Sequence, residues 1–208
     1  MLPIETQMTF LMASILLALA PGPDNIFVLT QSALHGRLAG IVVMLGLCTG
    51  LIVHSSAVAF GVAVIFQTSV LAFTILKFVG AAYLVYLAWG AFRAPATAIR
   101  NSQNGHIKYG KLYRRGIIMN ITNPKVSIFF LAFLPQFADP QRGAITIQML
   151  FLGGLFIIAT IVIFGAIALL AGTLGRWLKQ SSRIQLILNR VAGTVFLGLA
   201  LKLATTER

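Results

Sequence analysis

The sequence has few acidic residues and one cysteine, and it is poor in charge as a whole. Only 4 of its 208 residues are Asp or Glu, 10% are charged and 58% are hydrophobic. Its mean hydropathy is +0.92, which excludes a soluble domain that must keep a polar surface. Cys48 stands alone, so an internal disulfide and a CxxC motif are also excluded.

The sequence lacks the residue patterns that are typical of enzyme active sites. The 3 histidines and 4 acids have no metal-ligand spacing, and no GxxxxGK[ST] phosphate loop is present. We therefore expect no metal, no cofactor and no ATP hydrolysis. An intramembrane enzyme would also need an activated nucleophile, for which the sequence offers no candidate cluster.

Basic residues are plentiful, with 16 Lys and Arg and a net charge of +12. Six of them fall between Arg93 and Arg115, and a second group runs from Arg176 to Arg190. Clustering between apolar segments is typical of cytoplasmic loops under the positive-inside rule, not of a nucleic-acid surface. We therefore expect a membrane protein with no nucleic-acid partner.

Six apolar segments are long enough to cross a bilayer core. They predict a single all-α transmembrane domain, residues 1–208, with six helices and a basic cytoplasmic loop at about 93–115. The predicted spans are 8–34, 38–66, 70–92, 116–137, 144–174 and 184–204.

The first span raises two alternatives. Ala18-Leu19-Ala20 resembles a signal-peptide cleavage site, but Met1–Gln7 contains no Lys or Arg, so we expect a retained span. Placing the basic loops in the cytoplasm puts both termini outside. A five-span chain, in which the first segment is re-entrant, would put the N-terminus inside and stays open.

The motif Pro21-Gly22-Pro23-Asp24-Asn25 interrupts the first apolar segment. Prolines remove backbone donors and break helices, and a membrane protein tolerates this at depth only against protein or a watery cavity. The motif therefore predicts a broken helix that takes part in a site.

A second break is predicted at Asn123-Pro124-Lys125 in the fourth span. The two halves of the chain also share a basic-Gly-aromatic-Leu pattern, at 77–84 in span three and 190–197 in span six. Three spans per copy is an odd number, so the copies, at about 8–92 and 116–204, would be inverted repeats.

Such repeats would bring Asp24 and Lys125 together, where they could neutralise one another. Freed helix ends beside them could bind the ammonium and carboxylate of an amino acid. His54 and Ser55, in span two, could bind substrate or relay protons. Packing alone could equally explain a Pro-kinked helix with a buried ion pair, or a histidine bonded to a neighbouring helix.

These motifs, with the run Gly80-Ala81-Ala82-Tyr83-Leu84 and six segments in a chain of this size, resemble the LysE/RhtB family of bacterial amino-acid exporters. The resemblance implies multi-pass insertion in the bacterial inner membrane and proton-driven amino-acid export. It implies substrate, protons and lipid as partners, and it leaves a homo-oligomer open.

The subgroup and the mechanism are expectations. Asp24 alone lies deep in a span, which favours a neutral substrate of the homoserine, homoserine-lactone or threonine type over a cationic one. The substrate ammonium would meet Asp24, and its carboxylate would meet Lys125 with the N–H groups around Asn25 and Asn123. A passive channel and a non-transporting assembly subunit remain the alternatives.

Overall fold

The computed structural model describes residues 2–62, 70–94, 108–180 and 182–205, and its regular elements within these ranges are helices. The elements are α1 (Ile4–Leu19), α2 (Pro23–His35), α3 (Arg37–Ala57), the π-helical turn η1 (Val58–Val62), α5 (Val70–Arg93), α6 (Tyr109–Ile121), α7 (Pro124–Ile128), the π-helical turn η2 (Phe129–Phe133), the 3-10 helices η3 (Leu134–Phe137) and η4 (Pro140–Arg142), α8 (Ile145–Gln180) and α9 (Ser182–Thr205). The all-α prediction is confirmed for the described residues.

Proline sets both predicted helix breaks. The helix α1 ends at Leu19, and α2 begins at Pro23 with its axis turned by 59°. The helix α6 ends at Ile121, and the chain from Pro124 to Phe137 is turned by 49°. In both cases proline occupies the first helical position, where its missing N–H removes no helical hydrogen bond.

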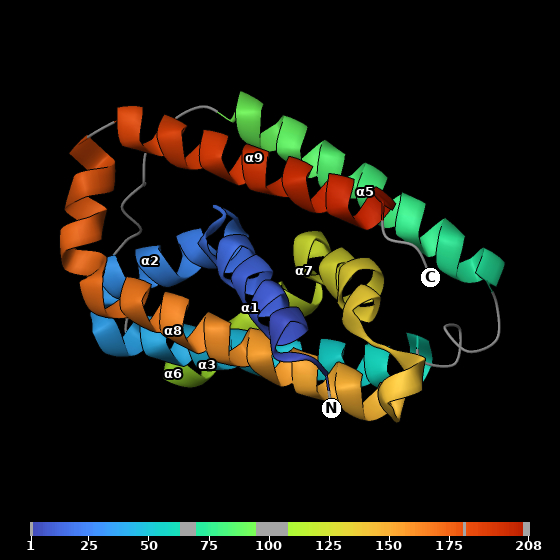
Figure 1. Ribbon diagram of the computed structural model, residues 1–208. Helices are drawn as coiled ribbons and strands as arrows, with labels where there is room; N and C mark the ends of the chain where they lie inside the picture. The colour runs from blue at the N-terminus through green and yellow to red at the C-terminus, as the bar shows by residue number, and fades with distance from the viewer. Residues whose placement is uncertain (1, 63–69, 95–107, 181, 206–208) are drawn as a thin grey trace.

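The broken segments lie inside the molecule. Figure 1 shows α1, α2 and α7 between the antiparallel pair α5–α9 and a layer made by α3, α6 and α8. A cluster of aromatic rings fills the space between α1, η2 and α8. The centroid of the Phe129 ring lies 5.2 Å from that of Phe156 and 6.0 Å from that of Phe10, with the rings tilted against one another. This packing fixes the positions of the two helix breaks relative to each other.

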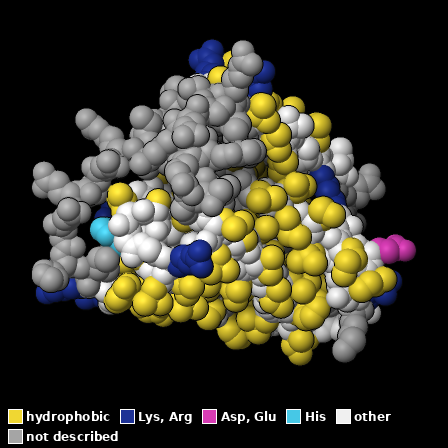
Figure 2. Space-filling view, turned by 90° about the vertical axis from the view of Figure 1, so that its left-hand side faces the viewer, with side chains coloured by type: hydrophobic (Ala, Val, Ile, Leu, Met, Phe, Trp, Pro, Cys, Tyr) yellow, Lys and Arg dark blue, Asp and Glu magenta, His cyan; other side chains and the backbone are white. Residues whose placement is uncertain are grey.

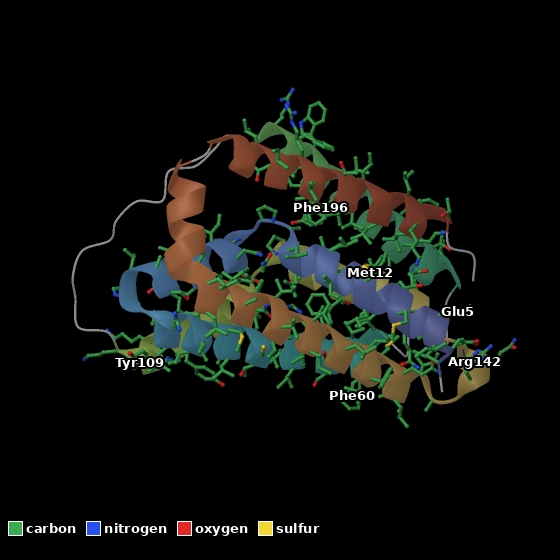
Figure 3. All side chains as sticks on the ribbon, turned by 60° about the vertical axis from the view of Figure 1, so that its left-hand side comes forward. Glu5, Met12, Phe60, Tyr109, Arg142 and Phe196 are labelled. Carbon is green, nitrogen blue, oxygen red and sulfur yellow. The ribbon has the colours of Figure 1, made fainter. Side chains whose placement is uncertain are left out.

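The two ends of the molecule differ in the elements they carry. Figure 1 places the N-terminus, η4 and the end of α9 at one end, and the α2–α3 and α8–α9 junctions at the other. In Figure 3, Glu5 and Arg142 lie at the first end and Tyr109 at the second. Tyr109, with which α6 begins, thus lies at the end of the molecule away from Glu5, and the side of the membrane that each end faces stays a prediction.

Membrane-spanning length is met by three of the described helices, over Arg37–Gly61, Thr74–Arg93 and Ile145–Ala171. The count rises to five if each bent pair, α1 with α2 and α6 with 124–137, forms one span. The predicted sixth segment is the helix α9, which is not among these five. Apolar side chains cover much of the surface in Figure 2, as lipid contact requires.

The fourth predicted segment begins earlier than the sequence suggested. The sequence predicts a loop at about 93–115, but α6 already begins at Tyr109, so the last part of the predicted loop is helical. Lys111, Arg114 and Arg115 are exposed on that helix. Long basic side chains at a helix end can extend their charges to the membrane surface, which is why their presence did not mark a loop.

The contact between α3 and α6 depends on two glycines. A Cβ on Gly116 would lie 2.7 Å from the Val43 carbonyl oxygen, and a Cβ on Gly46 would collide with the Tyr113 carbonyl oxygen. The two glycines thus allow α3 and α6 to approach closely. Gly36 differs from them: it has a φ of 86° at the α2–α3 turn, and a Cβ there would meet nothing within 4 Å.

We expect Gly116→Leu to lower the free energy of unfolding by about 1–3 kcal/mol, because the added side chain would force α6 away from α3. Thermal unfolding of the purified protein in detergent measures this. Gly110→Leu, on the same helix but with nothing within 4 Å of its Cβ position, is the matched control. Equal melting temperatures for the two variants would contradict the close-contact assignment.

Candidate functional site

The two helix breaks present opposite charges to one another. Asp24 lies in the first turn of α2 and Lys125 in the first turn of α7. Both side chains are buried, with 3% and 7% of their surface exposed. They line the same small cavity, so the structure brings together the two residues that the repeat argument paired.

The Lys125 ammonium is held by the end of α1. Its Nζ atom donates hydrogen bonds to the carbonyl oxygens of Leu17, at 3.1 Å, and Ala20, at 3.0 Å. The Leu17 carbonyl is free because the residue four positions on is Pro21, which has no N–H to donate. A cation at a helix C-terminus is also favoured by the helix dipole.

Aromatic contact adds to this cation site. The ring of Phe196 on α9 lies 6.0 Å from Lys125 Nζ, at the outer limit of a cation–π contact. Figure 3 shows Phe196 on the side of α9 that faces α1. The ammonium is thus enclosed by α1, α7 and α9.

Asp24 is only partly satisfied. Its Oδ2 atom accepts a long hydrogen bond of 3.4 Å from the Asn120 side chain, and its Oδ1 atom is buried without a partner among the described residues. The predicted neutralisation by Lys125 takes no direct form: the ion pair within 4.0 Å among the described residues is Arg142–Asp139. Carbonyl groups, instead of the carboxylate, take the ammonium's hydrogen bonds.

The remaining motif residues shape the two breaks. Asn25 donates from Nδ2 to the Ala18 carbonyl at 2.6 Å, and Asn123 caps α7 by accepting from the Lys125 backbone N–H at 3.0 Å. A Cβ on Gly22 would lie 3.2 Å from Lys125 Nζ, so glycine leaves room for the ammonium. Pro23 and Pro124 are exposed and begin their helices.

The two predicted residues of α3 differ in position. His54 Nε2 lies 3.2 Å from the Asn120 carbonyl oxygen, which links the ring to α6 beside the site. The Ser55 hydroxyl donates to the Leu51 carbonyl at 2.8 Å, and Ser55 packs against Gly153 of α8. The structure therefore brings His54 to the edge of the site and places Ser55 outside the cavity.

The cavity between the breaks has a volume of about 10 Å³, room for about one water molecule. Polar side chains enter it from four elements: Asp24 from α2, Asn120 from α6, Lys125 from α7 and Thr160 from α8. Its other lining residues are Leu17, Ala18, Leu51, Val126, Phe156 and Phe164. An amino acid does not fit this volume, so its entry would require the helices to move.

Sequence reasoning missed two lining residues, Asn120 and Thr160. Each is a buried polar side chain, 2% exposed, inside a predicted span. Asn120 lies four residues before Pro124, and Thr160 stands alone in the apolar run of α8. A search for isolated amides and hydroxyls within apolar spans would have found both. Among the described residues, no cluster of His, Cys, Asp and Glu could hold a metal ion.

Comparison with known proteins gives one family for nearly the whole chain. The sequence profile described as LysE type translocator matches residues 15–207. The homoserine/homoserine lactone efflux protein of Salmonella typhimurium is 34% identical over 203 residues, covering 98% of each chain. No solved structure matches this chain.

Two further relatives carry no assigned activity. An uncharacterized membrane protein of Vibrio cholerae is 35% identical over 207 residues and 98% of each chain. An uncharacterized membrane protein of Pseudomonas aeruginosa is 28% identical over 202 residues, 95% of this chain and 94% of its own. The LysE type translocator profile and the Salmonella typhimurium efflux protein, together with the apolar helices, indicate a multi-pass membrane transporter and not an enzyme.

Proposed function

This chain belongs to the LysE type translocator family, and we propose that it exports a small neutral amino acid or derivative across the bacterial inner membrane. The Salmonella typhimurium relative is named for the efflux of homoserine and homoserine lactone. Homoserine, its lactone and threonine are therefore the first candidate substrates. The inward flow of protons would drive the export.

One observation carries this proposal: two helix breaks place buried, opposite charges on one cavity. Asp24 Oδ1 has no hydrogen-bond partner in the part of the chain that the structure describes, and it could accept from a substrate ammonium. Lys125 could bind the substrate carboxylate. Buried charges in a membrane protein are costly and usually serve the transport path, so a structural role alone explains them poorly.

The bonds of Lys125 suggest how substrate enters the site. Leu17 and Ala20 offer two carbonyl oxygens to a primary ammonium group, which is the chemistry of an amino acid's own ammonium. Substrate can compete for these carbonyls while its carboxylate draws the Lys125 side chain toward itself. The exchange needs no net loss of hydrogen bonds, because one ammonium replaces another.

Movement of the helices follows from the proposed architecture of six spans in two inverted three-helix repeats. The pairing of α5 with α9 and the contact of α3 with α8 each join corresponding segments of the two halves. Rocking of one half against the other would open the cavity to each side in turn. The two proline breaks would move with their own halves.

Proton coupling is assigned to Asp24. Its carboxylate can carry a proton inward when no substrate ammonium occupies the site. Asn120 lies between His54 and this carboxylate: its backbone carbonyl oxygen contacts the His54 ring, and its side-chain amide donates to Asp24. An amide does not pass a proton on, so a relay from His54 to Asp24 would need a bridging water molecule.

Transport in liposomes tests the proposal. Purified protein in vesicles with an acidic interior should accumulate labelled homoserine or threonine, and collapse of the pH gradient should abolish the accumulation. Protein-free vesicles are the control. Flux that ignores the gradient would favour a passive channel, and no flux for any amino acid would favour a non-transporting assembly subunit.

A further inference from the structure

Thr160 differs from many of the hydroxyl residues in the described helices. A buried serine or threonine in a helix commonly donates to the carbonyl four residues earlier. The described helices contain many such bonds, those of Thr9, Ser14, Thr49, Ser55, Thr122, Ser127, Thr194 and Thr205. No hydrogen bond to the described part of the chain engages the Thr160 hydroxyl, although only 2% of Thr160 is exposed.

The position of Thr160 in the cavity would allow its hydroxyl to bond to a bound molecule. Thr160 lines the cavity that also contains Asp24 and Lys125. The cavity is small enough that one small molecule would reach all three side chains at once. Phe156 and Phe164 lie one helical turn before and after Thr160 and line the same cavity.

We propose that Thr160 determines specificity by hydrogen bonding the side-chain hydroxyl of a short amino acid. The proposal rests on the proposed function, in which Asp24 and Lys125 take the ammonium and the carboxylate. The side chain of the substrate would then contact α8. A neutral hydroxyl fits there, because the remaining lining residues are apolar apart from the neutral amide of Asn120, and none of them carries a charge that could pair with a charged side chain.

The flanking phenylalanines set the size of the side chain. Phe156 and Phe164 are both 4% exposed, and Phe156 is held by ring contacts to Phe129 at 5.2 Å and Phe130 at 5.1 Å. In this structure the cavity has room for about one water molecule, and once the helices move apart, rigid rings on either side of one hydroxyl would admit a short chain that ends beside it. A substrate without the hydroxyl would exclude water from the cavity and leave the Thr160 hydroxyl without a hydrogen bond, which gives a basis for rejecting a near-isostere.

The test compares homoserine with 2-aminobutyrate, which lacks only the hydroxyl group. In competition for uptake into proteoliposomes, the wild-type protein should prefer homoserine by about 10-fold or more. Thr160→Val, which keeps the shape and removes the hydroxyl, should lose most of this preference while still transporting 2-aminobutyrate. Thr160→Ser should restore the preference.

Thr194→Val is the matched control, because Thr194 is exposed on α9 and bonds to the Arg190 carbonyl away from the cavity. It should keep the wild-type preference. A wild-type protein that transports both compounds equally well would overturn the role of Thr160 and leave amino-acid export intact. Failure to transport either compound, or any other amino acid, would instead refute the proposed function. Should Thr160→Val not insert, the wild-type ratio and Thr160→Ala decide the question.

Discussion

Asp24→Asn is expected to insert and fold but to lose accumulation of substrate against a gradient. The neutral amide can still accept the hydrogen bond from Asn120, so the packing of α2 should survive. It cannot pair with an ammonium ion or exchange a proton. Loss of one charge-assisted hydrogen bond should reduce transport by about 10- to 100-fold, and loss of the proton site should remove the response to pH.

Initial rates of labelled amino-acid uptake, with and without an acidic interior, measure both effects. Glu5→Gln removes a carboxylate from the exposed beginning of α1 and serves as the control. It should transport at the wild-type rate. Gradient-driven accumulation by Asp24→Asn at the wild-type level would mean that neither substrate binding nor coupling depends on this carboxylate.

Lys125→Met should lose both transport and stability. Methionine fills a similar volume but leaves the carbonyls of Leu17 and Ala20 without their donor. It also leaves Asp24 buried without a nearby cation. We expect the free energy of unfolding to fall by about 1–3 kcal/mol, the cost of leaving buried acceptors unpaired. Thermal unfolding in detergent measures the stability, and liposome uptake measures transport.

Two comparisons sharpen this result. Lys111→Met removes an exposed lysine of α6 and should change neither property. Adding Asp24→Asn to Lys125→Met should recover part of the stability, since no uncompensated carboxylate remains, but it should not recover transport. A Lys125→Met protein with wild-type stability would show that the bonds to α1 contribute little to holding the two breaks together.

Much of the architecture could be predicted because proline and charge act locally. Pro21, Pro23 and Pro124 dictate where the helices break, and burial of Asp24 and Lys125 follows from their apolar surroundings. The start of α6 at Tyr109 was missed, because helical and loop segments at a membrane surface can be equally basic.

Partners across helices could not be predicted in the same way. Opposite charges suggested an ion pair, yet Lys125 bonds to backbone carbonyls, which carry no signal in the sequence. Asn120 and Thr160 face the cavity through the packing of α6 and α8. A Cβ on Gly50 of α3 would lie 2.6 Å from the amide oxygen of Asn120. The position of the Asn120 side chain therefore depends on a glycine in another helix.

The missing N–H of Pro21 has a consequence for which groups compete for the Leu17 carbonyl. A residue with an N–H group that extended α1 to this position would donate to the Leu17 carbonyl and compete there with every ammonium ion. Proline has no backbone N–H group and cannot donate this hydrogen bond at any pH or salt concentration. The covalent structure of Pro21 therefore leaves the Leu17 carbonyl open as an acceptor. Ammonium groups compete for it, and that of Lys125 is one of them.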